Sequence, residues 1–382
     1  MNRKLFCRLG LTYALFYLAY TAFFPFQTIY LTSLGHSQQT ISLLSICTAL
    51  GNFLIQFPVG HFSCKISSRR KFLGALMFCA VFLGFLPLLL CEGVIWSVLA
   101  FLPVTLVDFT LIGQLDAFAL CVPDVPYSMV RAVGSLSGAL ATLVLGKIYA
   151  GYHTWLMFPL HGICMSLAML SLVGLPKLSA AKRGQAVQVY GSVRPFFSLF
   201  LGGGMLFLAW RAILVYLPLL LVEQGGTAAH QGLSMSLMSF GAMPVLLLYP
   251  YVRKFCSCRL LVTIGGCTMA VRAALIPLLS DPQALAWVQI LEALSYGLLQ
   301  PAVMDMISQA APDSLQPPVV ALWTGIQMAL CTVVSNVLIQ FLTQWLSLSR
   351  CFFVLAVIAL AGLLPVWSFT RFYTNKEVLS HD

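Results

Sequence analysis

Long apolar stretches alternate with short polar ones along the whole chain. Each stretch is about 20 residues long, which is the length that an α-helix needs to cross a bilayer. The stretches predict twelve transmembrane helices, at about residues 9–31, 40–62, 72–90, 94–121, 129–149, 155–175, 195–222, 232–252, 260–279, 284–310, 319–342 and 351–369. They lack the strict alternation of polar and apolar residues that is typical of a membrane β-barrel. The pattern therefore predicts an all-α membrane protein.

Composition supports this interpretation, because 60% of the residues are hydrophobic and only 8% are charged. Soluble domains are about 25% charged. The net charge of +10 does not point to nucleic acid here, since Lys and Arg mark the cytoplasmic loops of membrane proteins. With the N-terminus inside, most of the 21 Lys and Arg fall on the cytoplasmic side. We expect a multi-pass protein of the cell (plasma) membrane with both termini cytoplasmic and an uncleaved first helix.

The chain is organised as two halves. The longest polar segment, residues 177–194, lies at its middle and predicts a cytoplasmic linker between six-helix bundles at residues 1–176 and 195–382. The motif Asp-x6-Pro-Asp occurs at residues 116–124 and again at 305–313, and Leu/Ile-Pro-Leu-Leu occurs at 86–89 and 276–279. Matches at nearly one offset predict a duplicated bundle, which is the two-half architecture of major facilitator transporters.

Several short motifs resemble a known group. They are Phe-Pro-Phe-x-x-Ile-Tyr-Leu at residues 24–31, Tyr-x-x-Val-Arg-x-x-Gly-Ser at 127–135 and Val-Gln-Ile-Leu-Glu at 288–292. These resemble the oligosaccharide/nucleoside–proton symporter branch of the major facilitator superfamily, which includes lactose permease and phenylpropionate transporter-like proteins. The resemblance implies that Asp116 and Arg131 form a substrate-binding pair and that Arg272 belongs to the coupling machinery. It also places Glu292 where relatives often carry His, and Ser295 where lactose permease carries its proton-binding carboxylate.

Two acidic positions stand out in the fourth predicted helix. Asp108 lies halfway along it and is expected near the bilayer centre, where a charge is expensive. It is either a proton or substrate carboxylate or a buried group bonded to a neighbouring helix. Asp116 and Arg131 lie near the cytoplasmic end, and they form either a substrate or gate pair or a structural ion pair.

A second candidate pair lies in the ninth and tenth predicted helices. Arg272 and Glu292 are about 9 and 11 positions from the turn at Asp281, so at a helical rise of about 1.5 Å per residue their depths match within roughly 3 Å. We expect an ion pair that is exchanged during proton transfer, or else a static pair.

Other polar side chains could contact a solute. Arg211, in the middle of the seventh predicted helix, would favour an anionic substrate; the alternatives are snorkelling or pairing with Asp305 or Asp108. Four uncharged residues of the first two predicted helices are candidates for hydrogen bonds to a solute: Gln27, Tyr30, Asn52 and Gln56. Each of these could also be an ordinary helix–helix contact.

The sequence thus predicts a secondary transporter for a small polar solute or organic anion that works by alternating access with proton coupling. The alternative is an uncoupled facilitator or an exporter of the same fold. An enzyme would need clustered catalytic side chains, and an ATP-driven pump would need GxxxxGK[ST]; neither is found. The His and Cys show no metal spacing, so we expect no metal and no cofactor. We expect a monomer whose partners are the solute, the proton and the lipid bilayer, with no nucleic acid.

Overall fold

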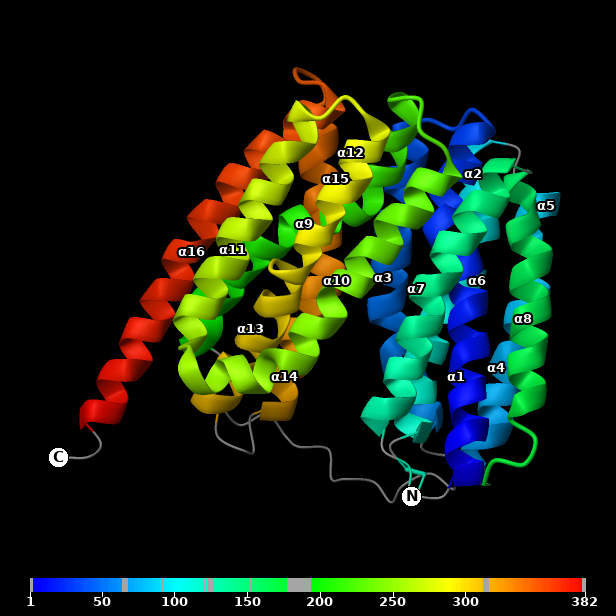
Figure 1. Cartoon of the computed structure of the whole chain (residues 1–382), viewed down its shortest axis with the longest axis horizontal. Coiled ribbons are helices and arrows are strands. Elements are labelled where there is room, and N and C mark those ends of the chain that lie inside the picture. Colours follow the sequence, from blue (N-terminus) through cyan, green and yellow to red (C-terminus); the bar gives the residue numbers. More distant parts are fainter. Residues whose placement is uncertain are drawn as a thin grey trace. The chain divides into compact units, whose positions relative to one another are not determined.

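The regular structure of the chain is helical throughout the part that can be described. A computed structural model describes residues 3–63, 68–90, 93–119, 121–122, 125, 127–151, 153–176, 194–311 and 316–379. Eleven helical segments within these residues are long and apolar enough to cross a membrane. The predicted all-α membrane fold is therefore confirmed (Figure 1).

The first of two compact units comprises Met1–Gln185 and Leu221–Ser236. Its helices up to residue 171 are α1 Arg3–Phe23, η1 Phe24–Phe26, α2 Gln27–Ser33, α3 Gln38–Ser63, α4 Arg69–Leu83, α5 Leu86–Leu89, α6 Val94–Ala119, α7 Tyr127–Gly151, η2 Thr154–Leu156 and α8 Met157–Ser171. Helix α1 packs against α7 and α8, and α6 packs against α3 and α4.

The second unit comprises Ala186–Leu220 and Leu237–Asp382. Its elements are η3 Arg194–Phe196, most of α9 Phe197–Glu223 and of α10 Ala228–Phe255, α11 Cys258–Leu275, η4 Ile276–Leu278, α12 Pro282–Trp287, η5 Val288–Ala293, α13 Tyr296–Ala310, α14 Gln316–Gly325, the π-helical turn η6 Ile326–Leu330, α15 Cys331–Leu342 and α16 Leu348–Leu379. Helix α11 packs against α13 and α16.

Several of the predicted helices are interrupted, and the first, predicted at about 9–31, contains the 3-10 segment η1 between α1 and α2. The helix expected over about 284–310 is instead α12, a 3-10 segment and α13, so the continuous helix predicted there was wrong. The segment predicted at 72–90 breaks between α4 and α5 before Pro87, and that predicted at 319–342 contains the π-helical turn. Apolar length alone does not report such breaks, because an interrupted helix is as hydrophobic as a regular one.

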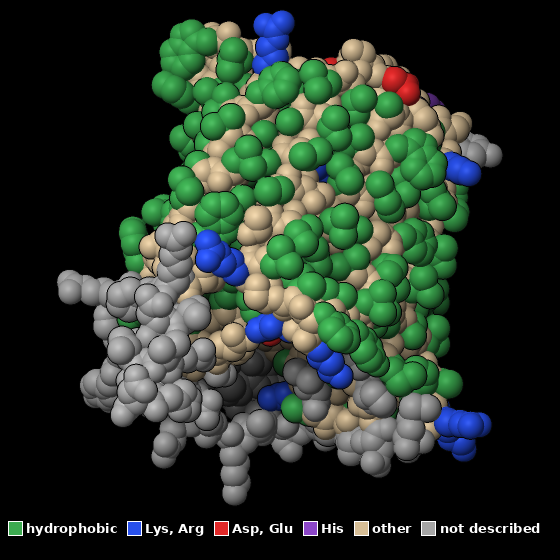
Figure 2. Space-filling model, turned by 60° about the vertical axis from the view of Figure 1, so that its left-hand side comes forward, with side chains coloured by type: hydrophobic (Ala, Val, Ile, Leu, Met, Phe, Trp, Pro, Cys, Tyr) green, Lys and Arg blue, Asp and Glu red, His purple; other side chains and the backbone are tan. Residues whose placement is uncertain are grey.

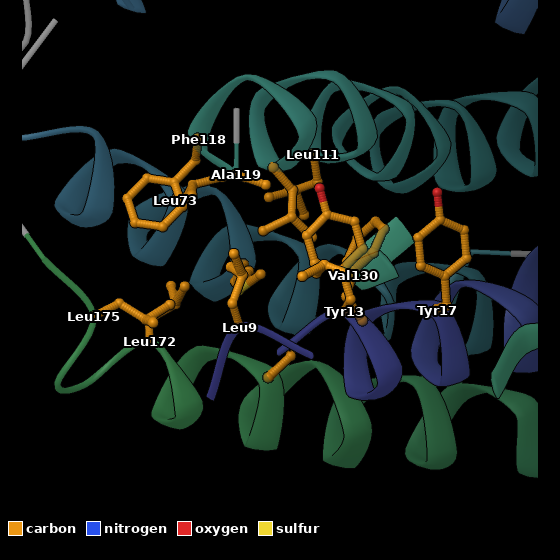
Figure 3. Packing of buried hydrophobic residues seen from close by; sticks show 14 of the residues in the cluster. Leu9, Tyr13, Tyr17, Leu73, Leu111, Phe118, Ala119, Val130, Leu172 and Leu175 are labelled. Atoms are coloured by element: carbon orange, nitrogen blue, oxygen red, sulfur yellow. The ribbon is translucent and has the colours of Figure 1, made fainter. Parts of the chain in front are cut away.

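The core of the first unit gathers side chains from α1, α4, α6, α7 and α8. Leu9, Tyr13, Leu73, Leu111 and Val130 belong to it and are almost fully buried (Figure 3). Outside the core, large apolar side chains face outward, and hydrophobic side chains cover most of the surface drawn in Figure 2. An apolar exterior of this extent fits contact with lipid.

Helices α9 and α16 come close together through two glycines. A Cβ atom at Gly202 would overlap the carbonyl oxygen of Gly362, and one at Gly362 would lie 2.8 Å from the carbonyl oxygen of Gly202. Small residues at such crossings allow helices in a membrane to approach closely. We expect Gly202→Val to lower the free energy of unfolding by about 1–3 kcal/mol, the usual cost of overpacking.

Thermal melting of the purified protein in detergent measures this effect. The matched control is Gly113→Ala on α6, where an added Cβ meets nothing within 4 Å. Equal melting temperatures for the two variants would show that the α9–α16 crossing tolerates a larger side chain.

Candidate functional site

The second unit contains a fully buried ion pair. Arg272 on α11 is 0% exposed and Glu292 on η5 is 4% exposed. The guanidinium Nη1 donates to Glu292 Oε2, while Nε and Nη2 donate to Gln289 Oε1 at 3.0 and 2.7 Å. Trp210 Nε1 on α9 donates to the other Glu292 oxygen at 2.8 Å. The structure thus brings together Arg272 and Glu292, as their matching depths predicted.

The 3-10 conformation of η5 explains how two side chains reach one guanidinium. Successive turns of a 3-10 helix contain three residues, so side chains at positions i and i+3 point in the same direction. Gln289 and Glu292 are three residues apart within Val288–Ala293, and both bind Arg272. The break continues to Ser295, whose buried hydroxyl has no hydrogen-bond partner among the described residues. The two side chains that bind Arg272 therefore come from the least regular part of the tenth predicted helix.

Arg211 on α9 lies against the π-helical turn. Its Nε donates to Thr332 Oγ1 at 2.5 Å, and its Nη2 donates to the carbonyl oxygen of Met328 at 3.2 Å. The guanidinium also lies over the Trp210 ring, 5.4 Å from the ring centroid. Asp305, one of the partners considered for Arg211, instead forms an ion pair with Arg253 at 3.2 Å. Arg211 is thus part of a polar junction between α9 and the interrupted helix α14–η6–α15.

More amide and hydroxyl groups continue this junction. Tyr216 donates its hydroxyl proton to Asn336 Oδ1 at 2.8 Å, and Asn336 Nδ2 donates to the carbonyl oxygen of Thr332 at 2.8 Å. Gln327 Nε2, within the π-helical turn, donates to Gln300 Oε1 at 2.8 Å. π-helical turns are frequent at functional sites.

An apolar groove lies on the same two helices. It has a volume of about 530 Å³ and is lined by Phe200, Gly204 and Leu208 of α9 and by Leu322 and Val334 across from them, among other apolar residues. Its lining carries no charged side chain, so a polar solute would find its ligands at the neighbouring polar junction and not in the groove.

In the first unit, Asp116 and Arg131 come together with two tyrosines of α1. Arg131 Nη1 lies 3.3 Å from Asp116 Oδ1 and also donates to the Tyr17 hydroxyl. Tyr13 donates its hydroxyl proton to Asp116 Oδ1 at 2.8 Å, and Figure 3 shows the two tyrosine hydroxyls on the same side of α1. Burial, reinforced by the charge of Asp116, raises the pKa of Tyr127 to about 12. This cluster is partly exposed, unlike the Arg272–Glu292 pair.

Asp108 and Asp116 share α6 but have different partners. Asp108 is 1% exposed, and both of its oxygens face Nε2 of His161 on α8, at 3.1 and 3.4 Å. The sequence hypothesis of a carboxylate bonded to a neighbouring helix fits this contact. Asp124 lies outside the described residues.

The four uncharged candidates are located in the first unit. Tyr30 is buried and packs edge-on against Phe158, with 4.9 Å between ring centroids. Gln27 Oε1 and Asn52 Oδ1 are buried without a hydrogen-bond partner among the described residues. The Gln56 side chain lies outside the described residues. Two unsatisfied amide oxygens are compatible with a solute or water ligand.

Sequence reasoning missed several partners of the predicted residues. His161, Trp210, Gln289 and Tyr13 were not singled out. For Gln289 a signal existed, since it precedes Glu292 by three residues in the recognised 288–292 motif. Among the described residues no group of three metal-ligating side chains occurs. The site offers buried ion pairs, titratable carboxyls and hydrogen-bonding amides, which suit binding of a proton and of a polar solute.

Comparisons with known proteins agree with this architecture. A model of the MFS_1 like family matches residues 6–354. The structure is similar to that of the nucleoside transporter NupG, with a TM-score of 0.79 and 14% identity over 97% of this chain and 100% of that chain. It is also similar to the POT family transporter PepTSo (TM-score 0.74, 10% identity, 97% and 98% covered) and to a D-xylose-proton symporter (TM-score 0.68, 16% identity, 95% and 97% covered). No curated protein sequence matches the chain.

Proposed function

The chain belongs to the MFS_1 like family of membrane transporters, and from this premise we propose that it is a proton-coupled secondary transporter. The solute is a small polar molecule or an organic anion, and it crosses the membrane by alternating access between two six-helix bundles. The bundles are those expected at residues 1–176 and 195–382, joined by a cytoplasmic linker. The resemblance to major facilitator transporters that the motifs indicated is confirmed by the family match.

The Arg272–Glu292 pair is the observation that carries the coupling proposal. Coupling requires a titratable group whose affinity for protons differs between conformations. Glu292 is such a group, because a proton on its carboxyl removes the charge that Arg272 binds. Gln289 continues to accept from Nε and Nη2 of Arg272, so the guanidinium keeps hydrogen-bond partners when Glu292 is neutral. Glu292 lies on η5, where the tenth predicted helix is interrupted, and Arg272 lies on the neighbouring helix α11.

The solute specificity rests on two cation-centred clusters. Arg131 with Asp116 in the first unit, and Arg211 with Thr332 in the second, present guanidinium groups beside hydroxyl and carboxyl acceptors. Guanidinium groups bind carboxylates and phosphates through paired hydrogen bonds. A solute with both a hydroxyl-rich and an anionic part would use both kinds of ligand. What the similar structures transport, such as nucleosides or D-xylose, provides candidates for the first tests.

The test begins with a thermal-shift screen of nucleosides, sugars and aromatic acids on the purified protein. A stabilising solute is then measured for uptake into proteoliposomes with an imposed pH gradient, with and without a protonophore. We expect accumulation above the external concentration that follows the pH gradient and is lost with the protonophore. Accumulation that survives the protonophore would exclude proton coupling, and uptake that only equilibrates would identify an uncoupled facilitator.

We further propose that the protein acts as a monomer in the cell membrane with both termini cytoplasmic. The orientation is supported by the asymmetric distribution of Lys and Arg along the sequence. Protease cleavage of a site inserted within residues 177–194 checks the orientation. Cleavage in inside-out vesicles but not in intact cells is the expected result.

A further inference from the structure

The first unit contains a second buried titratable pair, which the proposed coupling through Glu292 does not use. Asp108 and His161 are 1% and 0% exposed, and they join α6 to α8. His161 Nε2 is the hydrogen-bond partner of both carboxyl oxygens, at 3.1 and 3.4 Å. Among the described residues, no other hydrogen bond reaches the Asp108 side chain. The pair is therefore isolated from water and from other donors.

The second nitrogen of the imidazole has no hydrogen-bond partner among the described residues. His161 Nδ1 is buried and faces Gly84, where α4 ends before the break that leads to α5. A Cβ atom at Gly84 would lie only 2.7 Å from Nδ1, so the glycine makes room for the ring. On another side the ring lies against Phe23, with 5.3 Å between ring centroids. The imidazole thus lies between Gly84 and Phe23, and its buried Nδ1 makes no hydrogen bond among the described residues.

Neither protonation state of this pair satisfies every group. With Nε2–H donating to an ionised Asp108 and no proton on Nδ1, the pair carries one net negative charge in a buried place. One added proton makes the pair neutral overall, either as imidazolium and carboxylate or as two neutral groups. In the imidazolium form, and in the neutral form whose carboxyl donates to Nε2, Nδ1 carries a proton and has no acceptor among the described residues. No protonation state of the pair therefore satisfies all of its hydrogen-bonding groups among the described residues.

Among the described residues, no other charge compensates the pair. The elements that pack against α6 and α8 are α1, α2, α3, α4, α5, α7 and η2. Tyr30 of α2 packs its ring against Phe101 and Phe158 and is not hydrogen-bonded to either member of the pair. Asp116 and Arg131 bind each other and the tyrosines of α1, and Arg69 and Arg70 of α4 donate to the carbonyl oxygens of Ala117 and Leu175. The other described titratable groups on these elements are not in hydrogen-bond contact with either member of the pair: Arg3, Lys4, Cys7, Arg8, Tyr20, Cys47, Lys71, Cys79, Tyr127, Lys147, Tyr149 and Cys164.

We propose that Asp108 and His161 together form a proton-binding site within the first unit, separate from Glu292. The site binds and releases one proton, which moves between the pair and water when the surrounding helices open. The use of this proton in transport rests on the proposed function, but the existence of the site does not.

Infrared difference spectroscopy of the purified full-length protein in lipid vesicles tests the site without a solute. A pH step across neutrality is applied to the wild type and to Asp108→Asn, which keeps a hydrogen-bonding group of the same shape. We expect the wild-type difference spectrum to contain a carboxyl or imidazole band that Asp108→Asn abolishes. His161→Gln should abolish or shift the same band, because both residues hold the proton.

Two matched controls separate the site from general effects. Asp281→Asn changes an exposed helix-capping carboxyl that is not in contact with the pair, and it should leave the difference spectrum unchanged. Gly84→Ala should shift the band by displacing the imidazole, whereas Gly74→Ala on the same helix, whose Cβ would meet only Leu172 at 4.0 Å, should not.

The outcomes are distinct. A spectrum that is identical in the wild type, Asp108→Asn and His161→Gln would overturn the proposal. A lower melting temperature in both variants with the band retained would overturn it as well, because the pair would then be only structural. If the band is present but uptake ignores the pH gradient, the proton-binding site stands and the proposed coupling fails. Loss of the band in both variants, with retention in Asp281→Asn and Gly74→Ala, is the expected result.

Discussion

Glu292→Leu is expected to lower the free energy of unfolding by about 3–5 kcal/mol, the usual cost of removing one partner of a buried ion pair. The physical reason is that Arg272 is fully buried and that a guanidinium cannot lose its proton in a protein. Its charge would remain without a counter-charge, held only by the two hydrogen bonds to Gln289. Trp210 Nε1 would lose its acceptor as well. Thermal and denaturant-induced unfolding in detergent measure the loss.

The double variant Arg272→Met/Glu292→Leu is the decisive control. It replaces both charges by apolar groups, which in buried pairs is often neutral or stabilising. We expect it to regain most of the stability that Glu292→Leu loses. Arg272→Met alone should cost less than Glu292→Leu, because a carboxyl can take up a proton and become neutral. A double variant as unstable as the sum of the two single ones would show that the residues do not interact.

Much of the fold could be predicted from apolar length and from the position of charges. Most helical segments start and end within a few residues of the predicted ranges, because a bilayer fixes both the length and the hydrophobicity of a span. The exceptions include α1, which begins earlier at Arg3, and α16, which ends later at Leu379. Arg272 and Glu292 could be paired from the sequence since antiparallel neighbours place equal depths side by side. Asp116 and Arg131 were paired through the family resemblance, and they are in contact.

The partners of these residues could not be predicted in the same way. His161 contacts Asp108 across 53 positions of the chain, and Trp210 contacts Glu292 across 82. Such pairs depend on which faces of two helices meet, and continuous apolar segments carry little periodicity that would reveal the buried face. The breaks at η5 and η6 were missed for a related reason. Backbone groups freed by an interruption are satisfied by tertiary contacts, such as that of Arg211 with the carbonyl oxygen of Met328.

The two buried pairs differ in a way that suggests different tasks. Arg272 carries a permanent positive charge, so the protonation state of Glu292 decides whether that charge has a counter-charge. Asp108 faces a histidine, whose imidazole can also hold a proton. In the coupling that we propose, a proton on Glu292 leaves the charge of Arg272 without a partner, whereas the Asp108–His161 pair can take up a proton without leaving a fixed charge unpaired. Loss of a proton from Glu292 should affect conformation more strongly than the same event at Asp108.

Glu292→Gln is accordingly expected to abolish solute accumulation driven by a pH gradient while leaving solute exchange across the membrane in place. Glutamine has nearly the shape of glutamate, and its amide oxygen can still accept from Arg272 or from Trp210. It cannot bind or release a proton, so the coupled step is lost although the solute ligands that we propose, Arg131 and Arg211, are unchanged.

Proteoliposome assays separate the two activities, because gradient-driven uptake requires the proton cycle and counterflow exchange of a labelled solute does not. The matched control is Glu223→Gln, which makes the same change at an exposed carboxyl at the end of α9 and should keep both activities. If Glu292→Gln keeps gradient-driven uptake per molecule and only lowers the amount of folded protein, then the Arg272–Glu292 pair is static. The titratable group would in that case have to be sought elsewhere, and among the described residues Asp108 with His161 is another ion pair that is equally well buried.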